Sequence, residues 1–171
     1  MVKAILQDTY VLTEATDAAR LLAASSYGVL LKNSQLKLSL IEAAYLYDAG
    51  KIELVSGKKK YDFDKFIKKA SKLEKQFFTR FCVFKDLRDR GYLVKTALKF
   101  GADFRVYDKG IKPGQDHAKW VVFPVSESEQ FTWYDFSAKN RVAHSTKKRL
   151  MIGIVDDEGD VTYYEIKWLR P

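Results

Sequence analysis

Residues 98–120 read LKFGADFRVYDKGIKPGQDHAKW, a stretch that brings a tyrosine and a histidine into one loop bounded by glycines and lysines. The segment Phe104 to Tyr107 is typical of a short strand, which the following glycine and proline residues end and turn. A second strand is expected at Trp120 to Phe123. His117 therefore lies at the mouth of a loop between two strands, ten residues after Tyr107. The pattern also fits a half-buried sheet tyrosine and an exposed loop histidine, because aromatic residues are common in strands.

The composition indicates a folded, cytoplasmic protein without a membrane partner. A chain of 171 residues with 47% hydrophobic content suits one compact domain or two small ones. No segment approaches the roughly 20 uninterrupted apolar residues of a membrane span, and the N-terminus MVKAILQDTY lacks the form of a signal peptide. The single cysteine, Cys82, has apolar neighbours, so we expect an inert core thiol and neither a disulfide nor a zinc site within the chain.

The chain is basic, with 30 lysine and arginine residues against 22 acidic ones and a net charge of +8. Such a balance favours a polyanionic partner, of which nucleic acid comes first. Composition alone decides little, because many small basic proteins are rich in lysine without binding nucleic acid. Only clustering of the charges strengthens the case.

The first third of the chain alternates short strands and helices. We expect one helix near Ala18 to Ala24 and strands near Ala4 to Leu6, Tyr10 to Leu12, Tyr27 to Leu31 and Ile52 to Val55. Ser39 and Glu42 form a capping box that begins a further helix, and Gly50 ends it. A turn with solvated lysines is expected at Gly57 to Lys60.

An apolar stripe with helical spacing follows. Asp62 can cap a helix whose apolar residues recur every three or four positions, which predicts one long or broken helix over about 63–90. We place the domain boundary near Phe84, inside or beside this helix. The N-terminal α/β domain is then 1–83 and the C-terminal domain 84–171.

The C-terminal half predicts a second sheet. Besides the two strands of the opening stretch, strands are expected at Tyr92 to Thr96, Leu150 to Val155 and Val161 to Trp168, and a helix at Phe131 to His144. The residues Asp156 to Asp160 join the last two strands as a hairpin with four acids in five positions. This order of elements predicts an α/β (α+β) chain.

The densest basic cluster is RVAHSTKKR, from Arg141 to Arg149. A helix end commonly carries one or two basic residues because of its dipole. The dipole does not account for four basic residues that a strand follows directly. Single-stranded or bulged RNA needs cations beside stacking groups, because its phosphates pair with cations and its splayed bases stack. The cluster therefore indicates RNA as the polyanion.

The loop and the cluster together offer a phenol from Tyr107, an imidazole from His117 and an ammonium from a lysine. This set lacks paired carboxylates, which a magnesium ion needs, so metal-dependent hydrolysis is not expected. The three groups suit transesterification within RNA, in which the 2′-hydroxyl attacks its own phosphate. One group removes the 2′ proton, one protonates the leaving 5′ oxygen, and one neutralises the charge on the phosphorane.

The chain resembles the archaeal tRNA-splicing endonucleases, or tRNA-intron lyases, over nearly its whole length. The likeness is carried by KDLRDRGYLVKTALKFGADFRVY at 85–107, by Tyr107 and His117 ten residues apart, by RVAHSTKKRL at 141–150 and by the ending VDDEGDVTYY. By this resemblance Tyr107 is the general base, His117 the general acid and Lys148 the residue that stabilises the transition state. A two-histidine scheme with His144 as the base is the alternative.

The resemblance also implies how RNA is held. Arg141 resembles the family arginine that reaches across to pinch a bulge base together with a residue of another active site. Where the family can place that second arginine, near the chain end, this sequence has Lys167 and Arg170. Further substrate contacts are expected from Lys119, Lys147 and His144.

The implied activity is cleavage of precursor tRNA at both intron boundaries, in a bulge-helix-bulge, to 2′,3′-cyclic phosphate and 5′-hydroxyl ends, with no metal or other cofactor. The implied fold has a small N-terminal mixed α/β domain and a C-terminal restriction-endonuclease-like domain, whose central mixed β-sheet is flanked by helices. The alternative function is a non-catalytic RNA-binding subunit of the same enzyme. A restriction-like DNA nuclease is disfavoured, because such enzymes need clustered acids for their metal.

Self-association is also implied by the resemblance. The acidic hairpin at 156–160 is expected to insert into a basic cleft of a neighbouring subunit, and the segment Tyr163 to Trp168 to pair with its symmetry mate. Two bulges in one substrate need two active sites at a fixed spacing. A dimer or tetramer is therefore expected, either of identical chains or with a structural paralogue.

Overall fold

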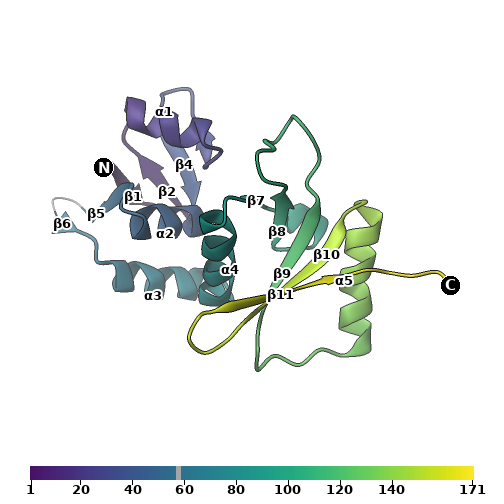
Figure 1. Cartoon of the computed structure of the whole chain (residues 1–171). Coiled ribbons are helices and arrows are strands. Elements are labelled where there is room, and N and C mark those ends of the chain that lie inside the picture. Colours follow the sequence, from purple (N-terminus) through teal and green to yellow (C-terminus); the bar gives the residue numbers. More distant parts are fainter. Residues whose placement is uncertain (57–58) are drawn as a thin grey trace. The chain divides into compact units, whose positions relative to one another are not determined.

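The computed structural model describes residues 1–56 and 59–171, and the chain divides into two compact units, Met1–Phe81 and Cys82–Pro171 (Figure 1). Each unit contains its own β-sheet. Helix α4 (Phe77–Asp89) carries the chain from the first unit into the second. Within these residues, no helix combines the length and the apolar character that crossing a membrane requires.

The first unit is built on a six-stranded sheet of order β3-β4-β2-β1-β5-β6, in which only β1 and β5 pair in parallel. Its elements are β1 (Val2–Leu6), β2 (Tyr10–Thr13), α1 (Asp17–Ala24), β3 (Val29–Leu30), β4 (Leu36–Ser39), α2 (Leu40–Asp48), β5 (Ile52–Ser56), β6 (Lys59–Lys60) and α3 (Phe63–Leu73). The strand expected at Tyr27 to Leu31 is shorter, because Gly28 has a φ of 56° and leaves the extended conformation. The turn expected at Gly57 to Lys60 includes residues 57 and 58, which lie outside the described residues.

Both ends of helix α2 are formed as the sequence predicts. The Ser39 hydroxyl accepts a hydrogen bond from the Glu42 amide at 3.3 Å, and the Glu42 carboxylate accepts one from the Ser39 amide at 3.1 Å. This capping box satisfies donors that the first helical turn leaves open. At the other end, Gly50 has a φ of 65°, and the amide of Lys51 donates to the carbonyl of Leu46 at 2.8 Å. The amide of Gly50 also donates to the carbonyl of Tyr47, at 2.9 Å. These two bonds form a Schellman motif with glycine in the left-handed position.

The helical stripe expected over 63–90 is broken into α3 and α4. Asp62 caps α3 by accepting a hydrogen bond from the Lys65 amide at 3.1 Å. The chain leaves the helix at Glu74, which is extended, and Gln76 has a left-handed φ of 52°. The spacing of the apolar residues does not reveal this break, because Phe77 is buried in the same way as Phe66 and Ala70 of α3.

The second unit is built on a five-stranded mixed sheet of order β11-β10-β9-β8-β7. Its further elements are β7 (Leu93–Thr96), the 3₁₀ helix η1 (Leu98–Phe100), β8 (Phe104–Tyr107), β9 (Trp120–Ser126), α5 (Trp133–Ser145), β10 (Arg149–Val155) and β11 (Val161–Ile166). Strands β9 and β10 are parallel and the other pairs antiparallel. Parallel neighbours need a crossover, which α5 supplies. The strands and the helix predicted here are all present, although the last strand, expected to reach Trp168, ends at Ile166; the α/β fold class is confirmed.

A helix covers each face of this sheet. On one face, Ala143 of α5 belongs to a buried cluster with Val121, Phe123 and Leu150 of strands β9 and β10. On the other, Phe84 of α4 lies with its ring 5.8 Å from that of Phe104, centroid to centroid. The central mixed sheet is therefore flanked by helices, as expected.

Gly153 of β10 lets α4 approach the sheet closely. A Cβ atom at this position would lie 3.0 Å from a methyl group of Val83 and 3.2 Å from the Tyr163 ring. The Tyr163 hydroxyl donates to the Asp86 carboxylate at 2.8 Å, and burial raises the pKa of that hydroxyl. Cys82, on the same helix, is partly buried, and burial raises the pKa of its thiol, which disfavours the reactive thiolate.

The acidic hairpin is a three-residue loop. The amide of Asp156 donates to the Asp160 carbonyl at 3.1 Å, and Gly159 adopts a left-handed φ of 89° between them. This is the common turn with a glycine bulge. The Asp156 carboxylate is used inside the loop, since it accepts from the amides of Glu158 and Asp160. The side chains of Asp157 and Glu158 are left exposed.

Candidate active site

A cavity of about 380 Å³ in the second unit brings the candidate catalytic residues together. It is lined by Arg105, Tyr107 and Lys148 and by the loop from Gly114 to Ala118, which includes His117. These residues come from strand β8, from the loop between β8 and β9, and from the turn between α5 and β10. Three segments far apart in the sequence thus meet at one hollow.

Tyr107 is the last residue of β8, where it pairs with Leu93 of β7. Successive side chains of a strand point to opposite faces of a sheet. Phe104 and Val106 are therefore on the α4 face, and Arg105 and Tyr107 on the face that α5 covers. Tyr107 is only 5% exposed, so it is a buried sheet tyrosine that also lines the cavity.

The loop that carries His117 is held by its own hydrogen bonds. The Lys112 amide donates to the Gln115 side-chain oxygen, and the Gln115 amide donates back to the Lys112 carbonyl, both at 3.0 Å. The Asp116 carboxylate accepts from the His117 amide at 2.6 Å. The histidine itself is exposed at the cavity mouth. It can therefore reach a solvent-borne substrate.

Lys148 is placed by the C-terminal turn of α5. Its amide donates to the Ala143 carbonyl at 2.9 Å, and the amide of Lys147 donates to the His144 carbonyl at 3.0 Å. Lys147 has a φ of 54°, so this is a Schellman motif with lysine in the left-handed position. Strand β10 begins directly afterwards, at Arg149. Lys148 is thus fixed between a closed helix end and a strand.

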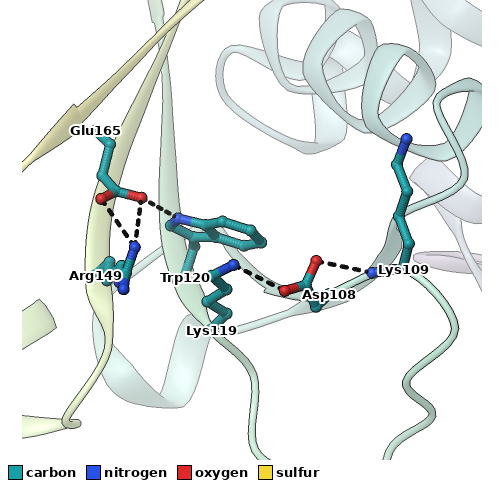
Figure 2. Close-up of polar contacts among 6 residues, drawn as sticks. All are labelled: Asp108, Lys109, Lys119, Trp120, Arg149 and Glu165. Carbon is teal, nitrogen blue, oxygen red and sulfur yellow. Dashed lines mark hydrogen bonds and ion pairs between the residues drawn. The ribbon is translucent and has the colours of Figure 1, made fainter.

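Lys119, expected to contact RNA, has another partner. Its ammonium donates to the Asp108 carboxylate at 2.8 Å (Figure 2), and this hydrogen bond lowers the pKa of Asp108. The same ammonium lies 4.4 Å from the centre of the Trp120 ring. The Trp120 indole donates to Glu165 at 2.7 Å, and Arg149 pairs with Glu165 at 3.2 Å. The indole bond, more than Arg149, lowers the pKa of Glu165. The network links the segment after His117 to strands β10 and β11.

Arg141 and His144 line a separate groove of about 660 Å³, formed by α5 and the segment after β11. The ring of His144 lies 5.3 Å from that of Trp168, between centroids, and Trp168 is 63% exposed. Lys147 is exposed on the turn between this groove and the catalytic cavity. His144 is absent from the lining of the cavity that holds His117, which disfavours a two-histidine scheme.

Lys148 connects the two regions. A hollow of about 290 Å³ beside the groove is lined by Lys148 together with His144, Arg149 and Trp168. The ammonium of Lys148 donates to the Thr146 carbonyl at 3.1 Å. Two other members of the basic cluster, His144 and Arg149, therefore line a hollow together with the candidate catalytic lysine.

Sequence reasoning missed two residues of this region. Arg105 lines the catalytic cavity, and its position two residues before Tyr107 on a strand was the available signal. Trp168 lines the groove with Arg141, at the chain end where the resemblance pointed to Lys167 and Arg170.

The cavity offers a phenol, an imidazole and two cationic side chains around one opening. Such a set can move a proton from one oxygen, deliver a proton to another, and stabilise negative charge between them. Over residues 1–56 and 59–171, no three His, Cys, Asp or Glu side chains are grouped so as to hold a metal ion.

Two family models match the chain. Residues 2–67 match the N-terminal domain of tRNA intron endonucleases, and residues 77–163 match their catalytic C-terminal domain. A tRNA-splicing endonuclease of Methanothermobacter thermautotrophicus is 40% identical over 166 residues, which is 97% of this chain and 96% of the relative. One of Nanoarchaeum equitans is 47% identical over 79% of this chain and 90% of its own length. The chain therefore belongs to the tRNA intron endonuclease family.

Proposed function

We propose that this protein is a tRNA-splicing endonuclease that cuts precursor tRNA at both intron boundaries. The observation that carries the proposal is the meeting of Tyr107, His117 and Lys148 at one cavity, in a chain whose relatives are named tRNA-splicing endonucleases. The substrate is a bulge-helix-bulge, and the products carry 2′,3′-cyclic phosphate and 5′-hydroxyl ends. The enzyme is in this scheme a tRNA-intron lyase that works without metal.

In the proposed reaction, the 2′-oxygen forms a bond to phosphorus while the bond from phosphorus to the 5′ oxygen breaks. Tyr107 accepts the proton of the 2′-hydroxyl, and His117 donates a proton to the leaving 5′ oxygen. Lys148 stabilises the extra negative charge of the phosphorane. The burial of Tyr107 and the exposure of His117 suit these tasks, because the base is held within the sheet and the acid is open to a substrate that arrives from solvent.

The groove beside the cavity is the proposed site for a bulge base. Arg141 and Trp168 both line it and can stack on a splayed base from a guanidinium and an indole face. His144 lies at the same groove, and Lys147 is exposed next to it. These residues hold the RNA in this scheme. Lys119 is a further proposed RNA contact, and its ammonium is held in place by the hydrogen bond to Asp108.

The proposed enzyme is a dimer or tetramer. Strand β11 is at the edge of its sheet, so one side of its backbone is available for pairing with a second chain. The exposed acids Asp157 and Glu158 are suited to a basic cleft on a neighbouring subunit. Both a homotetramer and an assembly with a structural paralogue satisfy this geometry.

The test of the proposed function uses a precursor tRNA with a bulge-helix-bulge and a matched RNA whose bulges are closed by base pairing. In excess EDTA, the wild-type protein is expected to release the intron from the first RNA and to leave the second intact. A Tyr107→Phe variant is expected to bind the first RNA and cut it far more slowly. Cutting that requires Mg²⁺ would contradict the proposal, and binding without cutting would identify a non-catalytic subunit.

A further inference from the structure

Arg105 has a buried donor without a partner inside the catalytic cavity. The side chain lines the cavity beside Tyr107, two residues away on the same face of β8. Its Nε atom is buried and finds no hydrogen-bond acceptor within the described part of the chain. Buried polar groups are hydrogen-bonded in most proteins, so an exception at a cavity needs a cause.

The charge of Arg105 is also unbalanced at this site. Arginine stays protonated at all ordinary pH values, so the group cannot escape burial by losing its proton. Arg149, by contrast, is paired with Glu165 at 3.2 Å. Among the described residues that line the same cavity, Asp116 is the single acid, and one of its carboxylate oxygens already accepts from the His117 amide. The cavity is therefore cationic and suited to an anion.

A guanidinium is shaped to bind a phosphate. Its N–H groups form a planar fork that matches two oxygens of one phosphoryl group, whereas an ammonium acts as a point charge. In the transesterification proposed above, the phosphodiester carries one negative charge and the phosphorane carries two. One lysine does not neutralise both, and Arg105 is the other permanently cationic side chain at the cavity.

We propose that Arg105 is a further catalytic residue, whose guanidinium binds the non-bridging oxygens of the scissile phosphodiester beside Lys148. The inference rests on the proposed endonuclease function. It explains the orphaned Nε, because the bound phosphate supplies the acceptor that the protein lacks. It also gives the two cavity residues of β8 separate tasks. Tyr107 acts on the 2′-hydroxyl, and Arg105 acts on the phosphate between the reacting oxygens.

The test compares Arg105→Met, which removes the charge, with Arg105→Lys, which keeps the charge and loses the fork. Arg20→Met is the matched control, since Arg20 is exposed in the first unit, where it pairs with Asp17 at 3.0 Å and donates to the Ser34 hydroxyl at 3.1 Å. Each protein is given three RNAs with the bulge-helix-bulge: the natural one, and the two isomers with sulfur in place of one non-bridging oxygen at the scissile phosphate. Binding is measured with an RNA that has a 2′-deoxy nucleotide at the cut.

Arg105→Met is expected to lower single-turnover cleavage of the natural RNA by about 10²–10³, as expected for losing an oxyanion donor. Binding of the 2′-deoxy RNA should change less than about tenfold. Wild-type protein should discriminate between the two sulfur isomers, and Arg105→Met should lose that discrimination. Arg105→Lys should recover part of the rate without the discrimination, and Arg20→Met should match the wild type.

Three results would overturn the inference while leaving the endonuclease function intact. Cleavage by Arg105→Met at the wild-type rate would show that Arg105 does not contact the reacting phosphate. A slow Arg105→Met that keeps the full discrimination between sulfur isomers would show a structural role. If Arg105→Met does not fold, the same comparison is made with Arg105→Lys, and unchanged discrimination there counts against the inference. A wild-type protein that cuts none of the RNAs would instead overturn the endonuclease function and this inference with it.

Discussion

The amide of Lys148 donates to the carbonyl of Ala143 at 2.9 Å, and this bond fixes the cavity lysine to the end of α5. Helix α2 ends with the same pattern of bonds, with Gly50 at the left-handed position. In α5 that position is occupied by Lys147, with a φ of 54°. A side chain in this region costs free energy that glycine does not. The turn that places Lys148 is therefore strained where the turn of α2 is not.

Lys147→Gly is expected to raise the free energy of unfolding by roughly 1 kcal/mol relative to Lys147→Ala, because only glycine removes the steric cost of the left-handed backbone. Both variants lose the same charge, so they are a matched pair. Lys147→Val should be less stable than either, since β-branched residues fit this region poorly. Urea unfolding followed by tryptophan fluorescence measures the differences. Equal stability of the glycine and alanine variants would show that the turn carries no strain.

His117→Ala is expected to leave RNA binding nearly intact and to lower cleavage by on the order of 10²–10⁴, the usual contribution of a general acid. A substrate with an activated 5′ leaving group does not need protonation, so it should restore much of the lost rate. His144→Ala is the comparison with the other histidine of the chain: it should weaken binding, and the activated substrate should not rescue it. Failure of the activated substrate to rescue His117→Ala would show that the acid has been wrongly assigned.

Gly153→Ala is expected to lower the free energy of unfolding by about 1–3 kcal/mol, because the new methyl group would lie 3.0 Å from Val83 across the interface between β10 and α4. Adding Val83→Ala to this variant makes room for the methyl group. The double variant should therefore be more stable than the sum of the two single changes predicts. Strict additivity in urea unfolding would show that the two side chains do not compete for the same space.

Much of the second unit could be predicted from the sequence, because its signals are local. The alternation of Phe104 to Tyr107 and the glycine of the acidic hairpin depend on neighbours within a few residues, and both elements are where the sequence places them. The end of α5 was harder to predict in detail. A Schellman turn usually has glycine at its left-handed position, and Lys147 gives no such signal.

The environments of the cations depend on distant partners. Lys119 and Arg105 are both basic residues near Tyr107. Asp108 pairs with Lys119 across the loop, whereas the Nε atom of Arg105 finds no hydrogen-bond partner in the described chain. Sequence spacing does not reveal which cation is already paired. The break between α3 and α4 is similar, because the apolar period continues through the left-handed Gln76.

Reversing the charges of Asp157 and Glu158 to lysine is expected to break the larger assembly into dimers and to abolish intron excision. Like charges facing a basic cleft repel by several kcal/mol across such an interface. The control replaces Asp8 and Asp64, two exposed acids of the first unit, with lysine, which changes the net charge by the same amount. This control variant should leave the assembly intact. Sedimentation measures the mass of each variant. A double variant with unchanged mass and full activity would show that the hairpin is only a solvated turn.

In the proposed reaction, the 2′-hydroxyl of the RNA, and not water, attacks the phosphate at the cavity of Tyr107, His117 and Lys148. The direct measurement is an analysis of product ends, in EDTA, from a bulge-helix-bulge RNA and from the same RNA with one 2′-deoxy nucleotide at the cut. The first RNA is expected to give a 2′,3′-cyclic phosphate and a 5′-hydroxyl, and the second to bind tightly without being cut. Cleavage of the 2′-deoxy RNA, or a 2′,3′-diol in place of the cyclic phosphate, would contradict the proposed reaction.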